Sequence, residues 1–312
     1  MTDKNPFGPT PPAPTDCCGC GPEAAKGGPA QLDETFYQQL DAYYAAGDAA
    51  GAEAFLVAAR DAAEVEENQQ DLATIYNELM GHYRTAGDWV ECERAMKGLL
   101  RAIRALHLKR GLEWATLTLN IANAQRAMGM LTEAERNFLM VRDEYEAALE
   151  PGDYRLASLY NNIGLTYRAK GQADIARGYF EKALAIVRQI PEAGTAVSAT
   201  CSNLADLLID AGDLDGASMY AHEAIAALAK PGMPLGVDFS AALAAAARID
   251  FARGELEEAI ELYSRAADSL EEAFGKTRAY GTICRNLAQV YQAAGMENEA
   301  ERMLAEASQA QA

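Results

Sequence analysis

The stretch that decides the fold is residues 161–186, NNIGLTYRAKGQADIARGYFEKALAI. On each side of its central break, AKGQA, small and apolar residues recur three to four positions apart, which places them on one face of a helix. Gly171 in the break supplies the left-handed backbone conformation that commonly closes a helix. The stretch therefore predicts two helices joined by a tight turn.

The same break recurs along most of the chain. Its glycines are Gly47, Gly87, Gly129, Gly171, Gly212, Gly254 and Gly295, at successive spacings of 40, 42, 42, 41, 42 and 41 residues. Five positions after each glycine the residue is small, as close helix crossing requires. A single helical hairpin cannot bury its apolar face, so we expect seven hairpins to stack as an all-α solenoid.

This arrangement of small and large residues around an Ala-Gly turn resembles the tetratricopeptide repeat. Ordinary repeats of that family have 34 residues, whereas these have about 42, which makes the chain similar to the repeats of kinesin light chain. The resemblance covers about nine-tenths of the chain. It implies that residues 31–312 form a right-handed α-solenoid, or superhelix, of seven hairpins.

The composition excludes several classes of protein. Half of the 312 residues are hydrophobic, 8% are aromatic and 23% are charged, which is typical of a soluble globular chain. The 27 Lys and Arg residues against 46 Asp and Glu residues give a net charge of −19, so we expect neither a nucleic-acid partner nor an anionic membrane. The sequence has no apolar run of membrane-spanning length and no signal peptide, which favours a cytoplasmic protein.

Residues 1–30 differ from the rest because they are rich in Pro and Gly and poor in large apolar residues, and we expect a flexible tail. The tail contains Cys17, Cys18 and Cys20. Three thiols in four positions are a weak candidate for binding a soft metal, but a closed zinc site needs four ligands. The alternative is that these thiols have no function, and we expect no cofactor.

Asparagine recurs nine positions before the glycine, at Asn120, Asn162, Asn203 and Asn286. A carboxamide both donates and accepts hydrogen bonds, so it can bridge the main-chain groups of an extended peptide. In peptide-binding tetratricopeptide proteins this position faces the concave groove, and by that resemblance these residues would contact a ligand. The alternative is that asparagine is a tolerated part of the repeat motif.

Arginine recurs three positions before the glycine, at Arg84, Arg126 and Arg168. Asn77 and Asn123 lie on the same side of their helices. Guanidinium groups pair with carboxylates through two parallel hydrogen bonds, so this strip predicts an acidic peptide or a C-terminal carboxylate as ligand. The alternative is that these arginines are solvated and hydrogen-bond the last carbonyl groups of their helices.

The sequence carries no phosphate loop, nucleotide fingerprint or GxSxG motif, and we expect no enzyme. The leading hypothesis is a protein interaction scaffold whose concave face binds an extended peptide or partner segment. The alternative resembles bacterial peptide-sensing tetratricopeptide regulators, but without a DNA-binding domain of its own. The last hairpin has no separate polar capping helix, which predicts a possible homo-oligomer through the C-terminal repeat.

Overall fold

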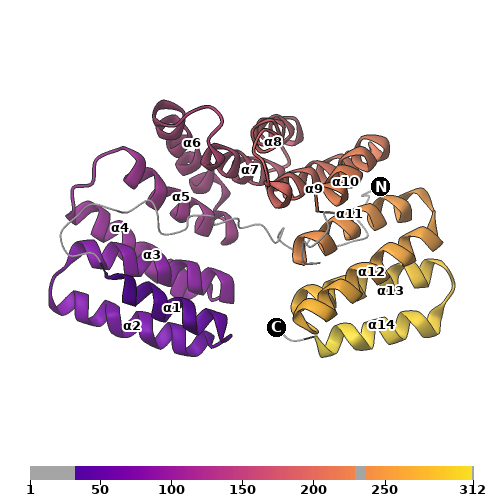
Figure 1. Ribbon diagram of the computed structural model, residues 1–312, viewed down its shortest axis with the longest axis horizontal. Coiled ribbons are helices and arrows are strands. Elements are labelled where there is room, and N and C mark those ends of the chain that lie inside the picture. Colours follow the sequence, from indigo (N-terminus) through magenta and orange to yellow (C-terminus); the bar gives the residue numbers. More distant parts are fainter. Residues whose placement is uncertain (1–31, 229–235, 311–312) are drawn as a thin grey trace. The chain divides into compact units, whose positions relative to one another are not determined.

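The computed structural model describes residues 32–228 and 236–310, and the predicted tail with Cys17, Cys18 and Cys20 lies outside them. All regular structure in these ranges is α-helical (Figure 1). The helices are α1 (Glu34–Ala45), α2 (Ala49–Val65), α3 (Gln69–Ala86), α4 (Trp89–Ala105), α5 (Leu112–Ala127), α6 (Leu131–Ala148), α7 (Tyr154–Ala169), α8 (Ala173–Val187), α9 (Gly194–Asp210), α10 (Leu214–Leu228), α11 (Val237–Arg253), α12 (Leu256–Phe274), α13 (Arg278–Ala293) and α14 (Glu297–Gln309).

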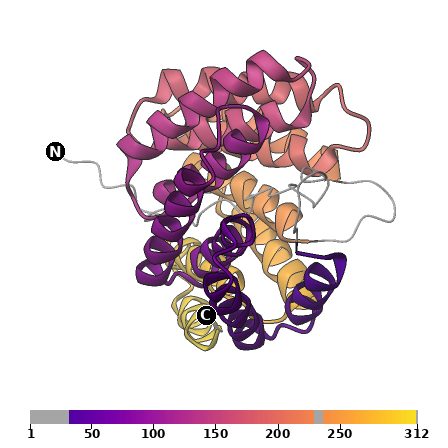
Figure 2. The ribbon, with the colours of Figure 1, turned by 90° about the vertical axis from the view of Figure 1, so that its left-hand side faces the viewer.

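The helices fall into two compact units. The first unit lies within residues 20–171 and contains α1 to α7, and the second contains α8 to α14, within residues 172–312. Within each unit, helices joined by a short turn pair with one another and successive hairpins lie side by side (Figures 1 and 2). The all-α prediction is confirmed, while the prediction of one domain over residues 31–312 stays a prediction.

The seven glycines lie where the repeat pattern requires them. Each has a positive φ, between 69° and 83°, and each follows the first helix of a hairpin. A residue with a Cβ atom is strained in this left-handed region, which is why glycine recurs at the turn. The sequence-based hairpin register is therefore confirmed.

The small residues predicted at helix crossings form the centre of each hairpin. The residues five positions after the glycines, Ala52, Cys92, Ala134, Ala176, Ala217, Ala259 and Ala300, are all at most 1% exposed. Large side chains nine positions after the turn glycine, such as Phe138 and Tyr263, are fully buried. Leu304, at the same position of the last hairpin, is 44% exposed. Leu304 lies on α14, after which the described chain contains no hairpin that could cover it.

Cys92, Cys201 and Cys284 are buried, reduced thiols. Burial raises the pKa of Cys201 to about 12, so this thiol is protonated at neutral pH. No helix in the described ranges has the length and apolar character needed to span a bilayer.

Tyrosine hydroxyls of α3 and α7 tie each of these helices to the helix that precedes it. Each tyrosine donates a hydrogen bond to a glutamate, and the same two pairs occur two hairpins apart. The pairs are Tyr83 with Glu53 (3.0 Å), Tyr76 with Glu64 (2.6 Å), Tyr167 with Glu135 (2.8 Å) and Tyr160 with Glu146 (2.8 Å). The glutamate partners were not foreseen from the sequence.

Candidate peptide-binding face

All nine predicted binding residues lie on the first helix of a hairpin, but they are divided between the two units. The first unit holds Asn77 and Arg84 on α3, Asn120, Asn123 and Arg126 on α5, and Asn162 and Arg168 on α7. The second unit holds Asn203 on α9 and Asn286 on α13.

A chain of side-chain hydrogen bonds joins α5 to α3. Asn120 Nδ2 donates to Asn77 Oδ1 (2.9 Å), and Asn77 Nδ2 donates to Glu78 Oε1 (3.4 Å). All three side chains are half-buried. Because a carboxamide has two N–H groups and two acceptor lone pairs, Asn120 and Asn77 retain capacity for further hydrogen bonds at this surface.

Arg84 and Arg126 lie at equivalent positions, three residues before the turn glycine, on α3 and α5, which pack against each other, and we call them the arginine pair. Burial lowers the pKa of Arg126, and both burial and the positive charge of Arg126 lower the pKa of Arg84. Two like charges in partly desolvated surroundings favour the approach of an anion, which stabilises both. Arg168, in the last turn of α7, is half-buried.

Three of the predicted asparagines are buried. Asn203 is 2% exposed, and Asn123 and Asn162 are also buried. Asn162 Nδ2 donates to the main-chain oxygen of Ser158 (3.1 Å). Within the described ranges, the Oδ1 atoms of Asn123 and Asn162 are buried and accept no hydrogen bond. Of the recurring asparagines, only Asn120 and Asn286 are half-buried.

In the second unit an ion pair occupies the corresponding face. Arg248 of α11 is 5% exposed and pairs with Asp206 of α9, and its Nη2 lies 3.8 Å from Asp210 Oδ1. These opposite charges satisfy one another within the unit. The face formed by α9 and α11 is therefore poorly suited to a charged ligand.

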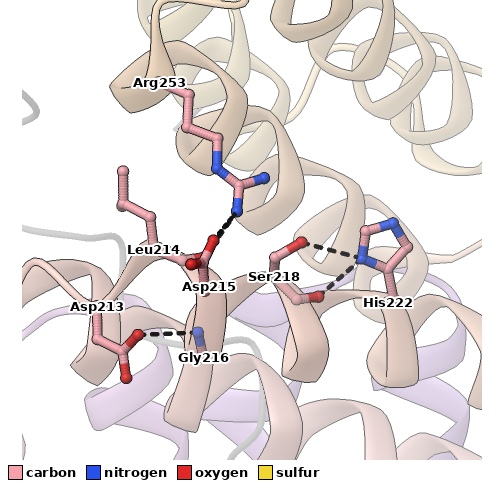
Figure 3. Close-up of polar contacts among 7 residues, drawn as sticks. All are labelled: Asp213, Leu214, Asp215, Gly216, Ser218, His222 and Arg253. Atoms are coloured by element: carbon pink, nitrogen blue, oxygen red, sulfur yellow. Dashed lines mark hydrogen bonds and ion pairs between the residues drawn. The ribbon is translucent and has the colours of Figure 1, made fainter.

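Exposed polar contacts also connect α10 and α11 (Figure 3). Arg253 Nη2 donates to Asp215 Oδ1 (2.8 Å), at the start of α10. Nearby, the Asp213 carboxylate accepts from the main-chain N–H of Gly216 (2.9 Å), and His222 Nδ1 donates to the main-chain oxygen of Ser218 (2.7 Å). These contacts fix the hairpin junction, and His222 is satisfied within its own helix.

The structure adds a cluster that the sequence analysis missed. The aromatic carboxylate cluster consists of Tyr37, Asp41 and Tyr44 from α1 with Glu78 and His82 from α3. The Tyr44 hydroxyl lies 3.3 Å from His82 Nδ1, and the two ring centroids are 6.1 Å apart. The spacing 37, 41, 44 places three of these residues on one face of α1, which is the signal that could have revealed the cluster.

In the described part of the chain, no group of three or more His, Cys, Asp or Glu residues lies close enough together to hold a metal ion. The candidate metal-binding thiols of Cys17, Cys18 and Cys20 lie outside the described residues.

A family model for the tetratricopeptide repeat matches residues 113–189, 154–230 and 238–311, which is more than half of the chain. The chain belongs to the tetratricopeptide repeat family. No curated protein sequence matches it significantly. The helical hairpins and the glycine register described above are thus those of a tetratricopeptide repeat protein with long repeats.

Several solved structures are similar to this chain. Rap protein complexed with Competence and Sporulation Factor has a TM-score of 0.63 and 16% identity, over 89% of this chain and 79% of that one. NprR in complex with its cognate peptide NprX has a TM-score of 0.58 and 14% identity, over 90% and 80%. Kinesin light chain-like repeats from Podosopora anserina have a TM-score of 0.50 and 21% identity, over 61% and 92%. At these identities the likeness shows the fold alone.

Proposed function

We propose that this tetratricopeptide repeat protein is a cytoplasmic interaction scaffold that binds an extended acidic peptide, or an acidic segment of a partner protein. The binding face is formed by α3, α5 and α7 of the first unit. The arginine pair receives a carboxylate, and Asn77 and Asn120 contact the peptide main chain. Arg168 extends this face along α7. In the second unit, Asn286 is half-buried, whereas the other predicted asparagine, Asn203, is buried.

The observation that carries this proposal is that α3 and α5 present two guanidinium groups and two hydrogen-bonded carboxamides together. The 2.9 Å contact between Asn120 and Asn77 fixes the two helices relative to each other at this point. Arginine recognises carboxylates with defined geometry because its N–H groups form parallel pairs of hydrogen bonds. The carboxamides accept and donate hydrogen bonds irrespective of the side chains of the peptide.

The net charge of −19 opposes an acidic ligand at long range, but salt screens that repulsion beyond about 8 Å at physiological ionic strength. At contact distance the attraction of the carboxylate to the arginine pair outweighs this repulsion. Nucleic acid would require many clustered cations, which the composition does not provide. The proposed ligand is therefore a short acidic stretch that reaches one local positive surface.

Capture of synthetic peptides tests this function. A pool of random octapeptides with two Glu residues and a matched pool with Gln in their place are incubated with the immobilised chain, and the bound peptides are quantified by mass spectrometry. We expect the Glu pool to be retained and to be released as salt is added. The double variant Arg84→Gln/Arg126→Gln should lose capture by about tenfold or more.

The matched control is Arg94→Gln/Arg104→Gln, which removes two positive charges from exposed positions of α4. This control should retain the Glu pool as the unchanged chain does. Equal losses in both double variants would mean that net charge, rather than the arginine pair, determines capture. Equal retention of the Glu and Gln pools by the unchanged chain would also contradict the proposal.

A second candidate function is that of a peptide-sensing regulator. Its support is the likeness to NprR, described as a quorum sensor from B. thuringiensis, and to Rap protein, both of which have been solved with peptides. A regulator should change conformation when the peptide binds, whereas a scaffold need not. Small-angle scattering with and without the captured Glu peptides distinguishes them, because only the regulator predicts a changed radius of gyration.

Self-association through the C-terminal repeat is part of the same proposal. Leu304 of α14 is exposed at a position that is buried in most other hairpins. Light scattering coupled to size-exclusion chromatography measures the mass, and Leu304→Glu should reduce any dimer to monomer. A mass of 33.5 kDa at every concentration would exclude this association.

A further inference from the structure

Glu78 is a half-buried carboxylate that forms no ion pair with any residue in the ranges 32–228 and 236–310. Its carboxylate accepts a hydrogen bond from Asn77 Nδ2 (3.4 Å). Burial raises the pKa of Glu78, the hydrogen bond from Asn77 opposes this, and the negative charge of Asp41 raises it further. A cation placed beside Glu78 would offset both the lost hydration and the repulsion from Asp41.

Aromatic side chains lie on the same side of α3 as this carboxylate: His82 is one helical turn from Glu78, and Tyr44 contacts His82. Burial, and after it the negative charge of Glu78, raise the pKa values of Tyr37 and Tyr44. Tyr44 is 44% exposed, and its hydroxyl lies 3.3 Å from His82 Nδ1. Aromatic faces beside a carboxylate favour an ammonium or guanidinium group, because the ring quadrupole attracts a cation.

Gly81 lies on α3 between Glu78 and Arg84, three positions from each. A Cβ atom added at Gly81 would meet no heavy atom within 4 Å. Glycine weakens the interior of a helix relative to alanine, and no side chain in the described ranges packs against Gly81 to require its small size. A glycine at such a position lets the main chain of a ligand approach the helix closely.

We propose that the peptide bound by the first unit carries a basic group as well as an acidic one. The aromatic carboxylate cluster receives the basic group, the main chain of the peptide crosses α3 at Gly81, and the acidic group reaches the arginine pair. This inference rests on the proposed peptide-binding function and adds the class of ligand. The ligand has a lysine, an arginine or a free amino terminus on one side of Gly81 and an acid on the other.

The geometry of α3 sets the spacing between the two charges. Glu78 and Arg84 are six positions apart, which is a rise of about 9 Å along the helix. An extended peptide covers about 3.3 Å per residue, so this rise alone needs about three residues. The cluster lies between α1 and α3 and the arginine pair between α3 and α5, which lengthens the path. We therefore expect the base and the acid to be about three to five residues apart.

Three pools of octapeptides, with acetylated and amidated ends, test the preference for a base. The first has Lys and Glu four positions apart, the second has norleucine in place of Lys, and the third has Gln in place of Glu. We expect the full chain to capture the Lys-Glu pool about tenfold more than the norleucine-Glu pool. Equal capture of these two pools overturns this inference and leaves the acidic-peptide function standing. Failure to capture any pool overturns both.

The variant Glu78→Gln keeps a hydrogen-bond acceptor for Asn77 but removes the negative charge. It should abolish the preference for lysine, so that capture of the Lys-Glu pool falls to the level of the norleucine-Glu pool. The control Glu133→Gln removes one charge from an exposed position of α6 and should keep the preference. A lysine preference that survives Glu78→Gln overturns the assignment of the basic group to this cluster.

The substitution Gly81→Leu tests the path of the peptide across α3. Gly178 of α8 is the matched control, because a Cβ atom there also meets nothing within 4 Å. Gly81→Leu should lose capture of the Lys-Glu pool by about tenfold or more, whereas Gly178→Leu should not. Gly81→Ala, which adds one methyl group, should raise the melting temperature and still weaken capture, which separates an effect on binding from an effect on folding. Unchanged capture by Gly81→Leu and Gly81→Ala overturns the proposed path.

Discussion

Glycines inside the helices differ in what surrounds them, and only the structure shows the difference. A Cβ atom at Gly98 of α4 would overlap the ring of Tyr76, which is buried and donates a hydrogen bond to Glu64. Gly178 of α8 has open space at the same atom. Gly98 therefore permits close packing of α3 against α4, whereas Gly178 only weakens its helix.

These surroundings predict opposite effects for one substitution. Gly98→Ala should lower the free energy of unfolding by about 1–3 kcal/mol, because the Tyr76 ring must move within a packed core. Gly178→Ala should raise it by up to about 1 kcal/mol through helix propensity. Urea denaturation followed by circular dichroism measures both. A stabilising Gly98→Ala would show that the Tyr76 ring moves at no cost.

Contacts between successive helices are specified by polar pairs as well as by small residues. Glu135 of α6 accepts a hydrogen bond from the Tyr167 hydroxyl (2.8 Å) and pairs with Lys170 at the end of α7. In the hairpin of α5 and α6, the usual tyrosine position holds Gln125, whose Oε1 accepts from Asn137 Nδ2 (2.7 Å). These two junctions thus differ in their polar contacts, although the arrangement of small residues is the same.

The junction between α6 and α7 should weaken in acid. The hydrogen bond from Lys170, and less strongly that from Tyr167, holds the pKa of Glu135 below its usual value of 4.5. Because the folded-state pKa is depressed, this stabilisation is present above the unfolded-state pKa and is lost as pH falls through the folded-state pKa. Glu135→Gln should therefore lower the melting temperature at pH 7 and have little effect at pH 3.

The control for this pH series is Glu133→Gln, an exposed position of the same helix, which should have little effect at either pH. Melting curves at pH values from 7 to 3 provide the comparison. A difference between Glu135→Gln and the unchanged chain that grows as pH falls would have the wrong sign for a depressed pKa.

At the scale of the whole molecule, each unit has a hydrophobic core of its own. One core lies among α1 to α5, around residues such as Leu56, Met80 and Leu99. Another lies among α11 to α14, around Tyr263 and Leu287. In repeat proteins each hairpin contacts only its neighbours, so stability is nearly a sum of local contributions. A defect in one core should therefore remain local.

Arg248→Met tests this locality. It leaves Asp206 without its buried cation, which should cost about 3–5 kcal/mol, so amide exchange should accelerate in α9 to α12 and remain unchanged in α3 and α4. Hydrogen exchange with mass spectrometry reads both regions at once. The control Arg253→Met breaks an ion pair with Asp215, whose side chain is 98% exposed, and should cost less than about 1 kcal/mol. Faster exchange in α3 and α4 would show that the two units unfold together.

The sequence by itself determined the all-α fold, the hairpin register and the position of every turn glycine. These features are local: a turn needs a residue that tolerates positive φ, and a helix crossing needs a small side chain, so both leave a fixed mark at every repeat. The same periodicity identified the helices that carry the candidate binding residues. It could not show that Asn203 is buried or that Asn120 bonds to Asn77, because those outcomes depend on the neighbouring helix.

Only the tertiary structure decided which polar side chains meet. Arg84 and Arg126 are 42 positions apart, and the charge of Arg126 acts on Arg84 because α3 packs against α5. Tyr44 and His82 are brought together from α1 and α3 in the same way. Burial and electrostatic coupling depend on distance in space, whereas a repeat pattern records only position within a helix. For that reason the helices could be predicted from the repeat pattern of the sequence, whereas the residues that make up the binding face could be identified only from the packed helices.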